Sequence, residues 1–186
     1  MKILGFNSGH DVSYAILENG IPIIHNELER FNRIKCTTGD SMKFLIDTLD
    51  LNEYKDAQYA VHYKPIQGYS YPSSIHQIKH IVKSNGGQFL EPGHHQSHAA
   101  AAFFSSNFKE SLIITFDGKG TENLNFINNP NIRNSVANSE GHMTSFTIWH
   151  GKDNKINEIY IDPYKISWGT YWYGTTGGVF GLGTGS

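Results

Sequence analysis

MKILGFNSGHDVSYAILENGIPIIHNE, residues 1–27, is the stretch that decides the fold. Within it, apolar runs typical of β-strands cover Lys2–Asn7, Ser13–Leu17 and Ile21–Asn26. Asn19-Gly20 separates the last two runs and is a strong signal for a tight hairpin turn. We therefore predict that the chain opens with three strands, and that a β-hairpin follows directly on the first of them.

Helices and strands alternate in the remainder of the chain. The expected elements are a helix from Asp40 or Ser41 to Leu49, a strand Ala57–Tyr63, a helix Ser73–Lys83, a short strand Gln88–Leu90, an alanine-rich helix His94–Phe104, a strand Leu112–Phe116 and a hairpin of Thr144–Trp149 with Ile156–Ile161. The strand Leu112–Phe116 is continuously apolar, which favours burial on both faces. The Asn-rich stretch Thr121–Glu140 is expected to be a loop or an insertion. The pattern is that of an α/β protein.

Composition narrows the class of protein. Hydrophobic residues make up 38% and charged residues 17% of the 186, which suits one globular domain with a sizeable core. The formal net charge is −2 and the basic residues are scattered, so no broad surface for nucleic acid or membrane is expected. Cys36 is the single cysteine, and the start of the chain lacks the pattern of a signal peptide, so we expect a cytoplasmic protein. With 10 tyrosines and 11 phenylalanines, a homo-oligomer is an open alternative.

A candidate metal site lies at the start of the predicted helix His94–Phe104. His94 and His98 are four residues apart, so their imidazoles project from one helix face, whereas His95 leaves on another. Asp117 follows the apolar strand, and strand ends in open α/β sheets are where ligands collect. Two imidazoles and a carboxylate are a common ligand set for Fe(II) or Zn(II). The alternative is that two surface histidines share a helix face by chance.

Two glycine-bearing turns are expected after strands. In Asp117-Gly118-Lys119-Gly120, exposed N–H groups can approach phosphate oxygens with no Cβ in the way at Gly118 and Gly120. In Asn7-Ser8-Gly9-His10-Asp11, His10 is a candidate acid/base group and Asp11 a candidate orienter of water or metal. An ordinary β-turn and an Asx-type turn with a solvated histidine are the alternatives. Two such turns with a first-strand hairpin are typical of the actin-like ATPase fold.

The stretch Glu27–Lys35 concentrates charge, and it offers Arg33 and Lys35 for recognition of a phosphate or an acyl phosphate. A solvated charged face is an equally good interpretation of such a run. Spacing alone does not decide between the two.

Three segments together resemble one family. They are the turn at residues 7–11, the charged stretch at residues 27–35, and His94-His95-x-x-His98-Ala99-Ala100 with Asp117-Gly118-x-Gly120. The set is similar to the start of the carbamoyltransferases that modify nodulation factors and antibiotics. Their N-terminal domain resembles the universal tRNA threonylcarbamoyl-transfer protein. The resemblance runs across the whole chain and implies the actin-like fold (sugar kinase, heat-shock-70, actin and ribonuclease H-like), here incomplete.

The resemblance implies an ATP-dependent O-carbamoyltransferase. Such an enzyme takes the carbamoyl group of carbamoyl phosphate, forms carbamoyladenylate with ATP, and passes the group to a hydroxyl of a small-molecule or nucleoside acceptor. The implied site has Fe(II) at His94, His98 and Asp117, ATP with Mg²⁺ at Gly9, Gly118, Gly120 and Arg33, and His10, Asp11 and Lys35 near the reacting centre. A further aspartate from later in the chain would complete the iron site.

Residues 1–186 are therefore expected to be the N-terminal portion of the actin-like carbamoyl-transfer domain. The rest of that domain, and a C-terminal domain that forms carbamoyladenylate, are expected to be absent, so that these residues have little or no activity alone. Two other functions stay open. One is an actin-like ATPase or kinase without iron, and the other is a metal- or nucleotide-binding half-protein that needs a separate partner chain.

Overall fold

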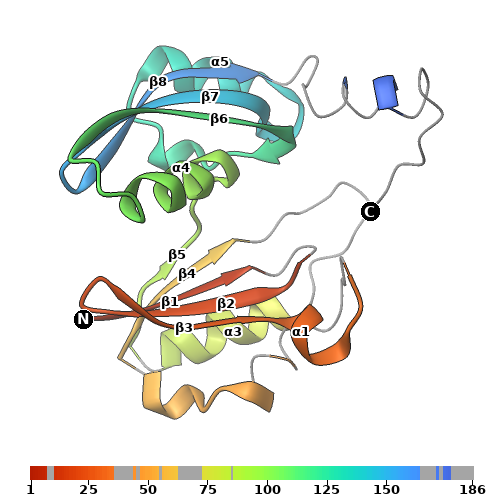
Figure 1. Ribbon diagram of the computed structural model, residues 1–186, viewed down its shortest axis with the longest axis vertical. Helices are drawn as coiled ribbons and strands as arrows, with labels where there is room; N and C mark the ends of the chain where they lie inside the picture. Colours follow the sequence, from red (N-terminus) through yellow and green to blue (C-terminus); the bar gives the residue numbers. More distant parts are fainter. Residues whose placement is uncertain are drawn as a thin grey trace. The chain divides into compact units, whose positions relative to one another are not determined.

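A computed structural model describes residues 1–7, 11–35, 44, 47–54, 56–62, 73–84, 86–163, 171 and 174–176 (Figure 1). The chain divides into two units, Met1–Glu91 and Pro92–Gly185. The described residues contain both helices and strands in mixed α/β order, as the sequence predicted. None of the helices in this described part is long and apolar enough to cross a membrane.

The first unit is built on a five-stranded sheet of order β3-β2-β1-β4-β5. Its elements are β1 (Lys2–Asn7), β2 (Ser13–Glu18), β3 (Ile21–Glu27), α1 (Leu28–Asn32), η1 (Leu51–Tyr54), β4 (Gln58–His62), α3 (Ser73–Ser84) and β5 (Phe89–Leu90). Strand β2 is antiparallel to both β1 and β3, while β4 is parallel to β1 and β5 to β4. Asn19 and Gly20 have positive φ angles of 51° and 83°, as a two-residue hairpin turn requires. The predicted opening of three strands with a hairpin is confirmed.

Alternating apolar residues of this sheet form the first core. Leu4 and Phe6 of β1 are buried with Tyr14 and Ile16 of β2, and Val82 of α3 belongs to the same cluster. Side chains alternate across a strand, so one face of β1 and β2 supplies all four strand residues. The helix predicted from Asp40 or Ser41 lies largely outside the described residues.

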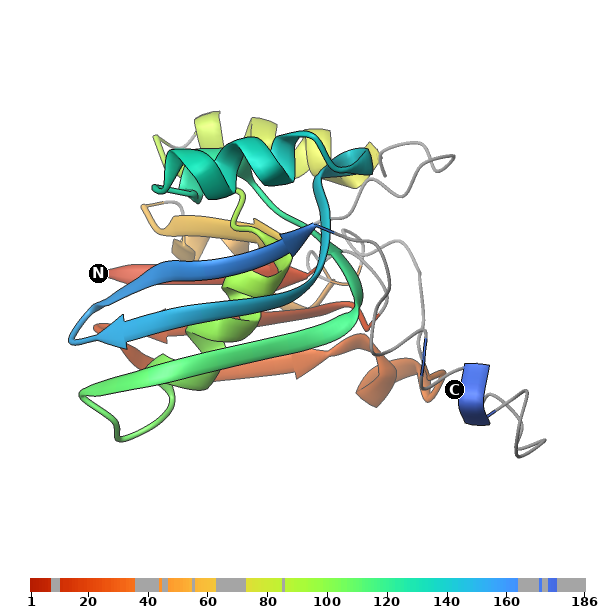
Figure 2. The same ribbon diagram turned by 90° about the horizontal axis from the view of Figure 1, so that it is seen from above.

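The second unit holds an antiparallel sheet of order β6-β7-β8 (Figure 2). Its elements are α4 (His94–Phe104), β6 (Glu110–Thr121), η2 (Leu124–Phe126), α5 (Pro130–Ala137), η3 (Glu140–His142), β7 (Met143–Lys152) and β8 (Lys155–Pro163). The core joins Ala99 and Phe103 of α4 to Ile113 of β6, Trp149 of β7 and Ile161 of β8. The predicted helix His94–Phe104 and the hairpin of β7 with β8 are confirmed.

The prediction that Leu112–Phe116 is buried on both faces is wrong. Leu112, Ile114 and Phe116 are 60%, 52% and 67% exposed, whereas Ile113 and Thr115 are buried. Within the part of the chain that the structure describes, β6 lies at the edge of an antiparallel sheet, and α4 packs on the face that carries Ile113. A continuous apolar run therefore alternates here between a covered face and an open one.

Of the two interpretations of Thr121–Glu140, a loop or an insertion, the loop is wrong, because the stretch contains the helical segments η2 and α5. Helix α5 begins within it, because the Asn129 side chain accepts hydrogen bonds from the backbone N–H groups of Asn131 and Ile132, and Pro130 occupies the first helical position. Asparagine is a favoured N-cap and proline is favoured at N1. The Asn-rich composition thus contained a helix start signal.

Candidate metal centre

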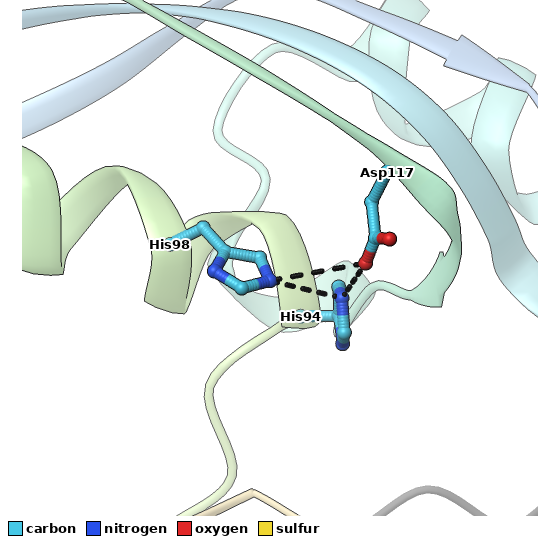
Figure 3. Close-up of side chains that lie close together, drawn as sticks. All are labelled: His94, His98 and Asp117. Atoms are coloured by element: carbon cyan, nitrogen blue, oxygen red, sulfur yellow. Dashed lines mark hydrogen bonds and ion pairs between the residues drawn. The ribbon is translucent and has the colours of Figure 1, made fainter. Parts of the chain in front are cut away.

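Helix α4 brings two imidazoles together at its start. His94 and His98 are one turn apart, their rings are 4.7 Å apart between centroids, and their Nε2 atoms are 3.1 Å apart (Figure 3). This is the one-face geometry that the i, i+4 spacing predicted.

Strand β6 adds a carboxylate to this pair. Asp117 Oδ2 lies 2.6 Å from His94 Nε2 and 3.9 Å from His98 Nε2, and one donor atom from each of the three residues lies within 4.8 Å of the other two (Figure 3). Metal–ligand bonds of about 2.1 Å at right angles place neighbouring donor atoms about 3 Å apart. The observed separations lie around that value, and the donor set of two nitrogens and one oxygen suits Fe(II) or Zn(II). These three residues therefore fit a divalent transition metal.

The pKa shifts of Asp117 and His98 favour the ionisation states that bind metal. The hydrogen bond with His94 holds the pKa of the Asp117 carboxyl well below its usual range, and the Gly118 N–H acts in the same direction against the effect of burial. Partial burial, and after it the neighbouring His94, lowers the pKa of His98. An ionised carboxylate and a neutral imidazole are the forms that coordinate a metal.

We expect His98 in the metal-free protein to titrate below the ordinary histidine value of about 6.5. The unfolded chain then takes up this proton first. The contribution of His98 to the free energy of unfolding is therefore complete above about pH 6.5 and is lost as the pH falls through the folded pKa. An NMR titration of the His98 ring protons measures that pKa. A midpoint at or above that of His98 in an unfolded peptide of the same local sequence would contradict the expectation.

Asp117 and the two glycines after it do not form a separate turn, contrary to the prediction. Strand β6 continues to Thr121, and its pairing with β7 shifts register between Phe116 and Gly120. The irregularity lets the Gly118 N–H reach Asp117 Oδ1 and sets Gly120 against the His94 ring. A Cβ built on Gly120 would lie 2.3 Å from His94 Cδ2, so the glycine makes room for this imidazole.

His95 lies behind this site and is wholly buried with Glu122 and Thr144. Its Nδ1 is 2.9 Å from Glu122 Oε1 and 2.8 Å from Thr144 Oγ1, and its backbone N–H donates to the same carboxylate oxygen at 2.8 Å. Burial raises the pKa of Glu122, but the hydrogen bonds and charge of His95 outweigh it and lower the pKa overall. The structure thus leaves His95 out of the metal-facing group, as the helix geometry predicted.

The remaining candidate residues belong to the first unit. Gly9 and His10 lie outside the described residues. Asp11 precedes β2 with a positive φ of 56°, and Arg33 ends α1 in a left-handed conformation with a φ of 61°. The Lys35 ammonium forms an ion pair with Glu29 at 3.2 Å.

Glu122 is the residue that reasoning from the sequence missed. It lies in the stretch that the sequence assigned to a loop, and its partner His95 is 27 positions away. No periodic pattern marks such a pair. The available signal was a carboxylate placed shortly after Asp117, in a stretch, Thr121–Glu140, whose other charged residues are Arg133 and Glu140.

Comparison with known proteins shows a distant similarity. No family model matches the chain. The chain is 31% identical over 190 residues to the uncharacterized protein MJ1051 of Methanocaldococcus jannaschii, an alignment that covers 88% of this chain and 36% of that protein. The chain thus spans about a third of the length of this relative.

Proposed function

We propose that the protein is an O-carbamoyltransferase that uses ATP and a divalent metal held by His94, His98 and Asp117. The resemblance to the carbamoyltransferases implies that this metal is Fe(II). The observation that carries the proposal is the meeting of two imidazole nitrogens and one carboxylate oxygen from α4 and β6. The resemblance in sequence supplies the reaction. The donor is carbamoyl phosphate, activated as carbamoyladenylate, and the acceptor is a hydroxyl of a small molecule or nucleoside.

The same observation disfavours the alternative of an iron-free ATPase or kinase. Mg²⁺ prefers oxygen ligands and keeps several waters, and phosphoryl transfer with Mg²⁺ uses carboxylates, not a pair of histidines. The first-strand hairpin of the first unit, with parallel strands beside β1, supports an actin-like fold but suits both functions. The metal is therefore the feature that separates the two.

The proposal assigns separate tasks to the chain's residues. Once bound, the metal supplies Lewis acidity and a template for a carbamoyl or nucleotide oxygen. His10 is proposed to accept the proton of the acceptor hydroxyl as the carbamoyl group passes to it and AMP leaves, and Asp11 to orient water or a metal. Lys35 and Arg33 are proposed to balance phosphate charge, which requires Lys35 to exchange Glu29 for the substrate. Backbone N–H groups at Gly9 and Gly118 are proposed to face phosphate oxygens, which requires the Gly118 N–H to leave Asp117 Oδ1.

The alignment covers 36% of the relative, so that protein is much longer than these 186 residues. We propose that adenylate formation belongs to a further domain and carbamoyl transfer to the part that contains these residues. In a variant of this proposal, the part that forms the adenylate is a separate partner chain, and these residues belong to a half-protein that works with it.

We expect no pyrophosphate release when the 186-residue protein is given ATP, Mg²⁺ and carbamoyl phosphate, and release when a chain with the adenylate-forming domain is used. Given preformed carbamoyladenylate and a hydroxyl acceptor, the 186 residues should show at most weak transfer, because losing positioning groups costs about 10²-fold or more. Robust release by the 186 residues would overturn the division of tasks. No release by the longer chain would favour the kinase-like alternative.

A further inference from the structure

We infer that Glu122 is a positioning residue of the proposed metal centre, holding the first turn of α4 so that His94 and His98 face Asp117. The inference rests on the proposed metal site and extends it to a residue that faces no metal. It follows from what the Glu122 carboxylate touches.

Glu122 performs the task of a helix cap from another part of the chain. Helix α4 starts after Gly93, which has no side chain with which to cap the first N–H groups. The Glu122 carboxylate accepts the N–H of His95 instead, in the first turn, and its negative charge lies at the helix end that favours anions. Gly93 itself leaves room for it, since a Cβ there would lie 2.1 Å from Glu122 Oε2.

The same carboxylate orients the ring beside the metal ligand. His95 Nδ1 faces Glu122 Oε1 and Thr144 Oγ1, while His95 Nε2 is buried and has no hydrogen-bond partner among the described residues. The hydrogen bonds that hold the His95 ring are therefore those of Nδ1 with Glu122 and Thr144. The His95 ring meets the His94 ring nearly edge-on, with centroids 5.1 Å apart and an interplanar angle of 71°.

Glu122 also ties the helix to the strand that supplies the third ligand. It follows β6 directly, one residue after the strand ends at Thr121, and its N–H donates to the carbonyl of His142. One continuous segment thus presents Asp117 to the metal, Gly120 to the His94 ring and Glu122 to the His95 backbone. Ligands must be held to within about 0.5 Å of a productive geometry, and groups behind the ligands supply that precision.

The test uses Co(II) as the probe on the 186-residue protein, because its visible absorption reports coordination geometry as well as occupancy. Glu122→Ala should weaken Co(II) binding about 10- to 100-fold and change the absorption band, by analogy with other residues that orient ligands. Glu122→Gln retains an oxygen that can accept the His95 N–H, so it should recover most of the affinity and the wild-type band. If Glu122→Ala does not fold, Glu122→Asp replaces it, because its carboxylate is one methylene shorter and should no longer hold the His95 N–H and ring, so that Co(II) binding weakens in the same way.

Thr147→Val is the matched control. Thr147 is buried in the same unit and bonded to Thr115 Oγ1 and Trp149 Nε1, so its loss should lower the melting temperature without changing Co(II) affinity or spectrum. Wild-type affinity and spectrum in the folded variant that lacks the contact, Glu122→Ala or Glu122→Asp, would overturn the inference, as would an equal loss in Thr147→Val. Failure of the wild-type protein to bind Co(II) would overturn the proposed metal centre itself, and the inference with it.

Discussion

Alanine in place of His94 or His98 is expected to abolish the binding of Fe(II) or Co(II). The wild-type protein, prepared without oxygen and without chelator, should bind about one metal ion per chain. Three donor atoms from the described residues converge on the site, so each of these variants leaves the metal with two of its three ligands. Changes even behind the ligands cost about 10–100-fold in affinity, and loss of a ligand should cost at least that much. Metal analysis after desalting and a Co(II) titration measure the effect. Asp117→Ala should behave in the same way.

His150→Ala is the matched control for this experiment. His150 lies on β7 in the same unit and also faces a carboxylate, Glu110, at 2.8 Å, but the structure brings no second histidine to that pair among the described residues. Metal binding should be unchanged in this variant. Full metal occupancy in the His94→Ala/His98→Ala double variant would exclude the assignment.

Alanine at Gly120 is expected to have the second largest effect, on both stability and metal binding. The new Cβ would lie 2.3 Å from His94 Cδ2 and 2.6 Å from His94 Cβ, which is too close for a side-chain rotation to relieve. The helix must move or the imidazole must leave the site. Overpacking of this kind costs about 1–3 kcal/mol of unfolding free energy. Metal affinity should fall because His94 is the ligand displaced.

Gly118→Ala provides the comparison two residues away. A Cβ on Gly118 would meet nothing within 4 Å, and neither glycine has a positive φ, so the free energy of unfolding should change by less than about 0.5 kcal/mol. Chemical denaturation and Co(II) titration of the two variants test the pair. Equal effects at Gly118 and Gly120 would contradict the fit of Gly120 to His94. Weaker ATP binding in Gly118→Ala with intact metal binding would support a phosphate role for that glycine.

Elements whose signals are local were predicted closely. The helix His94–Phe104 has the predicted bounds, because an alanine-rich run and i, i+4 spacing act within one segment. The Asn19-Gly20 turn is equally local. The helix Pro130–Ala137 was not predicted, because its Asn-rich composition is typical of a loop, whereas its start signal is confined to the two residues Asn129 and Pro130.

Burial of β6 could not be predicted in this way. Alternation in a sequence reports which faces are covered only when polar residues occupy the open face, and here Leu112, Ile114 and Phe116 are exposed apolar residues. Which face is covered depends on where α4 packs, and no residue within the strand encodes that position. The continuation of β6 through Asp117 was missed for a related reason, since two glycines suggested a turn and pairing with β7 kept the strand extended.

The sequence alone determined that His94 and His98 share one face of a helix, because the helical repeat places residues four apart together whatever surrounds them. It also singled out Asp117 as a partner. Only the tertiary structure decided that the Asp117 carboxylate meets both imidazoles, that Gly120 lies under the His94 ring, and that Glu122 holds the His95 backbone. These contacts join positions that lie from 19 residues apart (His98 and Asp117) to 27 residues apart (His95 and Glu122). Their geometry depends on the register of β6 against β7 and on the packing of α4, which no local pattern specifies.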